Sequence, residues 1–218
     1  MISSLFHPVV ITTSAISCLV FGSWFTFWYK TNLARTERER AYVCTLLSSF
    51  VTSLCSLPYV YYFLKNEGHF PDFMSNFQTN QLPVIITTFF MTFLFMDLTI
   101  GSIFYPKKIE LLTGWIHHLT YLATLTWAIH QRYCAIFIMM CSLEIPTFLL
   151  ALASVRSRFR HDYLFAVAFV FTRILFHAFT IRCAWKSAVL NPVSYRSILI
   201  ALSSFFPVHC YWFYGTYE

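Results

Sequence analysis

The sequence predicts an all-α protein, a polytopic bundle of about seven transmembrane helices. Of its 218 residues, 58% are hydrophobic and only 11% are charged, whereas soluble domains contain roughly 25% charged residues. The hydrophobic residues also gather in runs of about 20, the length that crosses a bilayer as a helix. Because lipid offers the backbone no hydrogen-bond partners, such runs favour helices over open strands.

The predicted spans follow one another with short connections. They are the apolar runs 8–28, 42–64, 83–104, 111–129, 133–153, 163–183 and 194–214. Only a few polar residues around His130 separate the fourth run from the fifth, which predicts a tight helical hairpin. The polar segment 65–82 predicts an ordered loop or a short re-entrant turn. We divide the chain into a first span with its basic loop (1–41), a transmembrane domain (42–214) and a short tail (215–218).

Three prolines, Pro58, Pro146 and Pro207, fall inside the predicted spans. A proline inside a helix leaves the carbonyl four residues earlier without its usual partner. Two interpretations stay open. The prolines are tolerated kinks, which membrane helices often contain, or the kinks in the fifth and seventh spans open a cavity between helices.

Basic residues are distributed unequally between the two sides of the predicted bundle. The loops after the first, third and fifth spans hold nine lysines and arginines, and the opposite loops hold five. Lysine and arginine accumulate in cytoplasmic loops, so we predict a lumenal or outside N-terminus and a cytoplasmic C-terminus. The net charge of +6 then reflects membrane topology, and we expect no nucleic-acid partner.

Ionisable side chains inside the spans are the candidate functional residues, because a charged group within the bilayer is costly and usually functional. At about 1.5 Å of rise per residue, five of six such residues lie between the cytoplasmic face and the bilayer centre. The six are Asp97, His117, Glu144, Arg173, His177 and His209. The same rise places His177 about 21 Å deep and His209 about 7 Å deep.

The pair His117-His118 is the strongest of these signals. Imidazole can act as a base, an acid, a nucleophile or a metal ligand near neutral pH. Thr120 and Thr124 continue the helical face of His117. Tyr121 lies beside that face, and His118 points about 100° away from it. Only one of the two imidazoles is therefore expected to face this polar stripe directly.

The candidate site combines catalytic residues with cavity-lining ones. We predict His117, His118 and Asp97 as catalytic residues, with Asp97 accepting a hydrogen bond from one histidine and orienting it. The predicted lipid-binding or cavity-lining residues are Thr120, Tyr121, Thr124, Glu144, Arg173 and His177.

Simpler roles stay open for several of these residues. Glu144 and Arg173 have opposite charge and similar depth, which fits a buried ion pair. His177 fits a hydrogen-bonded link between two helices. A proton-coupled transporter is a further alternative, although no inverted repeat supports it. A di-iron centre needs several histidine boxes, and the chain has one adjacent pair, so we predict no metal and no cofactor.

Four short motifs occur in order along the chain. They are Phe95-Met96-Asp97-Leu98, Trp115-Ile116-His117-His118, Glu144-x-Pro146-Thr147 and Phe171-Thr172-Arg173-x-x-Phe176. Together with the aromatic seventh span they resemble the TLC-domain family, which includes the ceramide synthases, over roughly residues 40–214. The resemblance implies a helical barrel around a lipid-sized cavity, in a multi-pass protein of the endoplasmic reticulum.

The resemblance also implies two functions. Ceramide synthases acylate a sphingoid base with acyl-CoA, so His117 or His118 would act as base or acyl acceptor, oriented by Asp97, with acyl-CoA as substrate. However, those enzymes carry an H-D-x-x-D motif in the next span, where this chain has Cys141-Ser142-Leu143-Glu144. The chain therefore resembles more closely the TLC-domain-only proteins, which handle lipids and influence membrane composition.

We accordingly expect a lipid-handling membrane protein that binds long acyl chains and influences membrane lipid composition or sphingolipid homeostasis. The alternative is a ceramide synthase-like N-acyltransferase. Whether the protein is an enzyme stays open. The expected partners are membrane lipids, and a homo-oligomer is left open as well.

Overall fold

The computed structural model describes residues 2–215, and the described chain is helical throughout, without strands. The all-α prediction is therefore confirmed. The α-helices are α1 (Pro8–Lys30), α2 (Glu37–Lys65), α3 (Phe70–Phe77), α4 (Leu82–Phe104), α5 (His117–Gln131), α6 (Cys134–Met140), α7 (Ile145–Val155), α8 (Asp162–Phe169), α9 (His177–Leu190) and α10 (Pro192–Gly215).

Five helical segments of the described chain are long and apolar enough to cross a membrane. They are Pro8–Lys30, Glu37–Lys65, Leu82–Phe104, Cys134–Val155 and Asp162–Leu190. Each overlaps one predicted span, and together they support a multi-pass membrane protein. The other two predicted spans, 111–129 and 194–214, are also helical but are not among these five segments.

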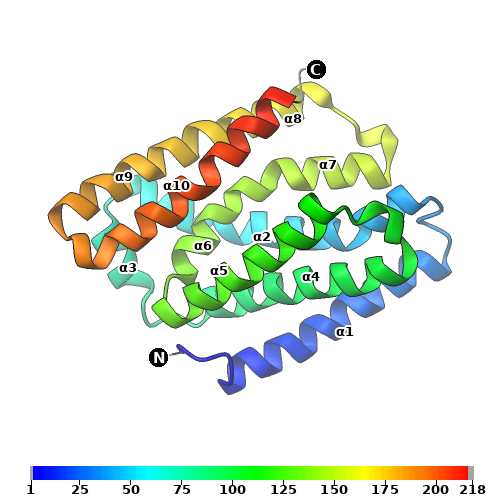
Figure 1. Cartoon of the computed structure of the whole chain (residues 1–218), viewed down its shortest axis with the longest axis horizontal. Coiled ribbons are helices and arrows are strands. Elements are labelled where there is room, and N and C mark those ends of the chain that lie inside the picture. Colours follow the sequence, from blue (N-terminus) through cyan, green and yellow to red (C-terminus); the bar gives the residue numbers. More distant parts are fainter. Residues whose placement is uncertain (1, 216–218) are drawn as a thin grey trace.

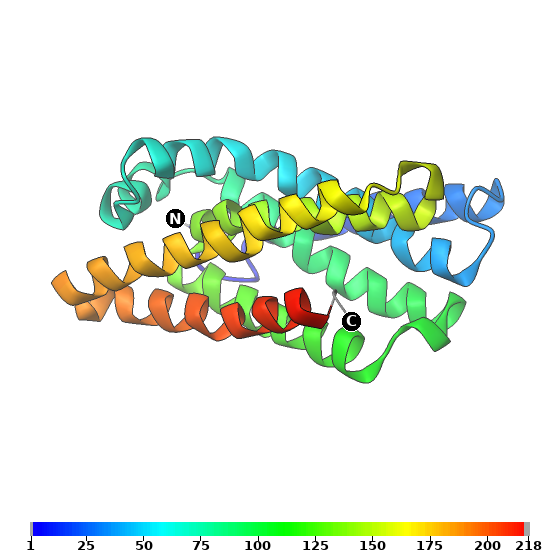
Figure 2. The same cartoon turned by 90° about the horizontal axis from the view of Figure 1, so that it is seen from above.

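The long helices lie side by side along the bundle axis (Figure 1). The connections α1–α2, α4–α5 and α7–α8 meet at one end, and the connections that follow α2, α5 and α9 lie at the other. Both views place α9 and α10 next to each other as an antiparallel hairpin (Figure 2). The three predicted cytoplasmic loops thus share one end of the bundle.

Local sequence explains where two of these elements differ from the predicted ranges. α2 begins at Glu37, five residues before the predicted span, because Thr36 and Glu39 form a capping box. The Thr36 hydroxyl accepts from the Glu39 amide at 3.1 Å, and the Glu39 carboxylate accepts from the Thr36 amide at 3.0 Å. The polar segment 65–82 contains the short helix α3, which buries Phe70 and Phe73.

Three irregular helical segments interrupt the bundle. η2 (Leu111–Ile116) and η5 (Val170–Phe176) are π-helical, and η3 (Cys141–Glu144) is a 3₁₀ turn. π-Helical turns are rare and often occur at functional sites. Here each one leads directly into a histidine that lines the same cavity, and η3 stands immediately before α7, which carries Pro146. Pro58 and Pro207 lie within continuous helices instead.

Three buried clusters hold the helices together. One gathers Phe63, Phe70 and Met139 around α2, α3 and α6, and another gathers Phe21 and Phe90 around α1 and α4. The third joins the N-terminal segment to α4 and α5 through Ile2, Val84 and Ile129. Apolar side chains also cover the outer surface of the helices, as expected where lipid replaces water. The inner packing also leaves a large cavity between the helices, described next.

Candidate functional site

A cavity of about 1000 Å³ lies between α2, α4, α5, α7, η5 and α10. Ligand pockets commonly measure about 300–1000 Å³ and combine apolar walls with a few polar groups. This cavity has that composition. Its walls include Phe90, Leu125 and Phe205, and its polar groups are contributed by α4, α5, η3 and η5.

His118 and Asp97 form a buried pair on the cavity wall. Nε2 of His118 lies 3.2 Å from Oδ2 of Asp97, and the two side chains are only 12% and 13% exposed. Nδ1 of His118 lies 2.8 Å from the carbonyl oxygen of Gly114, in the π-helical turn η2. Because a carbonyl only accepts, Nδ1 carries the hydrogen of this bond, and Nε2 faces the carboxyl group of Asp97.

Tyr105, directly after α4, completes this arrangement. Its hydroxyl donates to Oδ1 of Asp97 at 3.0 Å. Burial raises the pKa of Tyr105 far above its usual range, so the phenol keeps its hydrogen and remains a donor. Both oxygens of Asp97 are therefore engaged, and both nitrogens of His118 are engaged as well.

His117 differs from its neighbour. Neither of its ring nitrogens has a hydrogen-bond partner among residues 2–215, and the ring lines the cavity. It packs 4.7 Å from the ring of Tyr121 and 6.0 Å from that of Trp212, measured between centroids. The pair is thus divided in role: His118 is fixed by Asp97 and Gly114, whereas His117 keeps free nitrogens for a ligand or a reaction.

A second imidazole pair joins η5–α9 to α10. Nε2 of His177 donates to the carbonyl oxygen of Leu202 at 3.0 Å, and Nδ1 of His177 lies 3.0 Å from Nδ1 of His209. In the neutral pair His209 must then donate from Nδ1, which leaves its Nε2 as an acceptor. Both rings are buried and line the cavity.

This contact corrects the depth estimated from the sequence. Equal rise from a common plane separated His177 from His209 by about 14 Å, yet the two rings touch. The two depths differ from the structure because α9 extends to Leu190, beyond the predicted end of its span. The ends of the two helices also do not lie in one common plane. His209, considered earlier only for its depth, belongs to the site.

Arg173 lies in the π-helical segment η5 and is 9% exposed. Its Nε donates to the Leu143 carbonyl at 3.0 Å, and its Nη2 donates to Thr147 Oγ1 at 2.7 Å. No carboxylate oxygen of the described residues lies within 4 Å of it, so the interpretation as an ion pair with Glu144 is wrong. Glu144 is half-buried and lines the same cavity.

The cavity brings together nearly all of the predicted site residues. Those that line it are Asp97, His117, His118, Tyr121, Thr124, Glu144, Arg173 and His177. Thr120 is the exception, since it is exposed and does not line the cavity. The cavity face of this helix is wider than the predicted stripe and is centred near Tyr121, because it includes His118 and Leu125 as well as His117 and Thr124.

Sequence reasoning missed two residues of the site. Tyr105 lies just outside the predicted span, and no pattern marks it as a partner of Asp97. Trp212 lies near the end of the aromatic seventh span, where one ring among many carries no signal. It contacts His117, His209 and Arg173.

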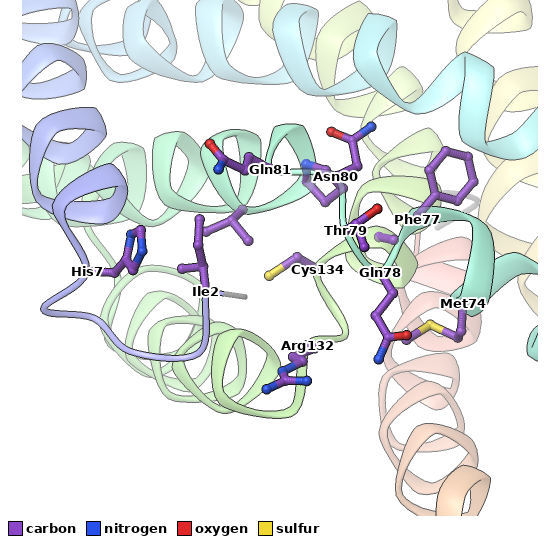
Figure 3. Close-up of a pocket in the computed structure, with 13 residues that line it drawn as sticks. Ile2, His7, Met74, Phe77, Gln78, Thr79, Asn80, Gln81, Arg132 and Cys134 are labelled. Atoms are coloured by element: carbon purple, nitrogen blue, oxygen red, sulfur yellow. The ribbon is translucent and has the colours of Figure 1, made fainter.

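A smaller cavity of about 320 Å³ lies apart from this site (Figure 3). It is lined by Ile2 and His7 of the N-terminal segment, by the α3–α4 connection at Gln78 and Asn80, and by Cys134 at the start of α6. None of the predicted site residues lines it. Across residues 2–215, no group of three or more His, Cys, Asp or Glu side chains is arranged to hold a metal ion.

Comparisons with protein-family models, with curated proteins and with solved structures give no match. The resemblance to the TLC-domain family therefore stays a prediction, and the functional argument rests on the cavity itself.

Proposed function

We propose that this protein is a lipid-handling membrane protein of the TLC-domain type, which crosses the endoplasmic reticulum membrane seven times and binds a long acyl chain in the large cavity. The cavity carries the proposal: it measures about 1000 Å³, it lies within the helix bundle, and its walls are largely aromatic and aliphatic. Through such binding the protein influences membrane lipid composition or sphingolipid homeostasis.

Native mass spectrometry of the gently purified full chain tests this proposal. We expect lipid adducts on the wild type and their loss in Ala201→Trp, which places an indole into the cavity. The matched control is Ile200→Trp, which adds the same ring to a side chain that is 57% exposed. Lipid-free wild type, or equal adducts on both variants, would contradict the proposal.

The position of His117 favours a second function, that of an N-acyltransferase. His117 lies in the cavity with free nitrogens, 5.6 Å between ring centroids from His118, which Asp97 holds in place. This arrangement suits N-acylation of a sphingoid base by acyl-CoA. A nitrogen of His117 attacks the thioester carbonyl, the C–S bond breaks and the CoA thiolate leaves. The amine then attacks the acyl-imidazole, the C–N bond to His117 breaks, and the proton lost by the amine converts the thiolate to the CoA thiol.

Membranes that contain the wild type or His117→Ala distinguish this enzyme from a binding protein. We expect acyl transfer from acyl-CoA to a long-chain base in the wild type and its loss in the variant. Equal rates would exclude catalysis by His117 and would leave the lipid-binding proposal intact.

A further inference from the structure

Arg173 is a buried cation whose hydrogen bonds are incomplete. Two of its three nitrogens are engaged with the cavity wall, Nε with Leu143 and Nη2 with Thr147. Nη1 has no partner among the described residues, and the residue lines the cavity. A buried guanidinium without a paired anion is costly, so its surroundings should supply one.

The neighbouring side chains do not supply that anion. The guanidinium carbon lies 5.3 Å from the ring centre of Phe169 and 5.5 Å from that of Trp212. Across Trp212 lie His117 and His209, which are neutral or cationic groups. The nearest candidate acid is Glu144 on the same cavity wall, and its carboxylate is more than 4 Å from every Arg173 nitrogen.

The aromatic rings also fix the guanidinium in place. Arginine stacks on aromatic faces and presents a rigid fork of donors that matches carboxylate and phosphate groups. Here that fork lies within 5.5 Å of the centres of two aromatic rings and borders the cavity. Such a position suits a ligand with an anionic head and a long apolar tail, which would extend along the Phe205 side of the cavity.

We propose that Arg173 binds the anionic headgroup, a carboxylate or a phosphate, of a single-chain lipid held in the cavity. This inference rests on the proposed lipid-binding function and names the class of lipid. Arg173 then determines the preference for anionic over neutral headgroups, and the carboxylate of Glu144 weakens the attraction between Arg173 and the lipid anion.

The test measures binding of dodecanoate, dodecyl phosphate and dodecanol to the full chain in phosphatidylcholine nanodiscs. We expect the wild type to bind at least one of the anions about tenfold more tightly than the alcohol, the effect of one charged hydrogen bond. Whichever anion binds more tightly identifies the headgroup.

Three variants locate the effect. Arg173→Gln should lose the tenfold preference while still binding dodecanol, which also shows that the variant is folded. Glu144→Gln should bind the anions more tightly than the wild type. Arg182→Gln, an exposed position outside the cavity, should match the wild type.

The outcomes separate this inference from the proposed function. Equal affinity of wild type for the alcohol and both anions, or equal loss of all three ligands in Arg173→Gln, would overturn the anion site and leave a neutral lipid cavity. Failure of the wild type to bind any of the three would overturn both.

Discussion

Two buried histidines of the cavity, His118 and His177, have similar surroundings but different partners. His118 and His177 each donate to a backbone carbonyl, of Gly114 and of Leu202, and each lies at or just after the end of a π-helical turn. The second nitrogen of His118 meets a carboxylate, whereas that of His177 meets another imidazole, His209.

This difference separates a pair that contains a carboxyl group from a pair made of two imidazoles. A carboxylate partner in a buried site makes the His118–Asp97 pair costly to break, because the remaining partner is left as an uncompensated polar or charged group. The His177–His209 pair holds together with neutral hydrogen bonds, each worth about 1 kcal/mol. We therefore expect the first pair to contribute more to stability and the second to respond more to ligands.

The largest effect is expected at Asp97. Asp97→Ala leaves Nε2 of His118 and the Tyr105 hydroxyl without their acceptor, so the free energy of unfolding should fall by about 3 kcal/mol. Unfolding of wild type and variant in SDS measures this change in the free energy of unfolding. The control is Asp72→Ala, whose pair with His69 is 2.8 Å long but 62% and 51% exposed, and whose loss should cost below about 1 kcal/mol.

A smaller effect is expected at the neutral pair. His177→Phe keeps the ring but leaves the Leu202 carbonyl and the His209 Nδ1 without a partner, so unfolding should become easier by about 2 kcal/mol. His130→Phe, at an exposed histidine, should change stability by less than about 0.5 kcal/mol. A loss at His177 as large as that at Asp97 would remove the distinction between the two pairs.

The position of Tyr105, which donates to Asp97, can be tested by a substitution at Gly101. A Cβ on Gly101 would overlap Cδ1 of Ile109 and lie 2.7 Å from Cε2 of Tyr105. Gly101→Ala should therefore displace Tyr105 from Asp97 and destabilise the protein by about 1 kcal/mol. Gly22→Ala, whose nearest neighbour is Met96 Cε at 3.9 Å, should leave stability unchanged or raise it. A neutral Gly101→Ala would show that Tyr105 is not held there.

The smallest effect on stability is expected at His117. His117→Ala removes a half-buried ring that has no hydrogen-bond partner among the described residues, so unfolding should change by less than about 1 kcal/mol. His118→Ala should exceed it, since it breaks two hydrogen bonds. The reverse order, measured in the same SDS assay, would exchange the roles assigned to the two histidines.

Much of the fold and part of the site follow from the sequence. Runs of apolar residues located the helices, and the depth of Asp97 and the His pair anticipated their proximity. The helical period predicted that only one imidazole would face the polar stripe, whereas both line the cavity. The period could not say which one is fixed by Asp97, because that depends on how α5 packs against α4.

The parts that the sequence did not predict depend on tertiary packing. Thr120 was assigned to the cavity by its spacing from His117, but the cavity face of this helix, which includes His117 and Tyr121, does not extend to it. The contact between His177 and His209 depends on how far α9 and α10 extend and how they lie against each other. The contact of Arg173 with Trp212 requires the end of α10 to return to η5.

The central claim, that the large cavity holds a long acyl chain, is tested most directly by photo-crosslinking. A long-chain fatty acid with a diazirine near its methyl end is added to membranes that contain the full chain, and the labelled residues are mapped by mass spectrometry. We predict labels on inward-facing positions such as Leu125 and Phe205. Labels confined to outward-facing positions such as Leu119 and Ile200 would contradict it.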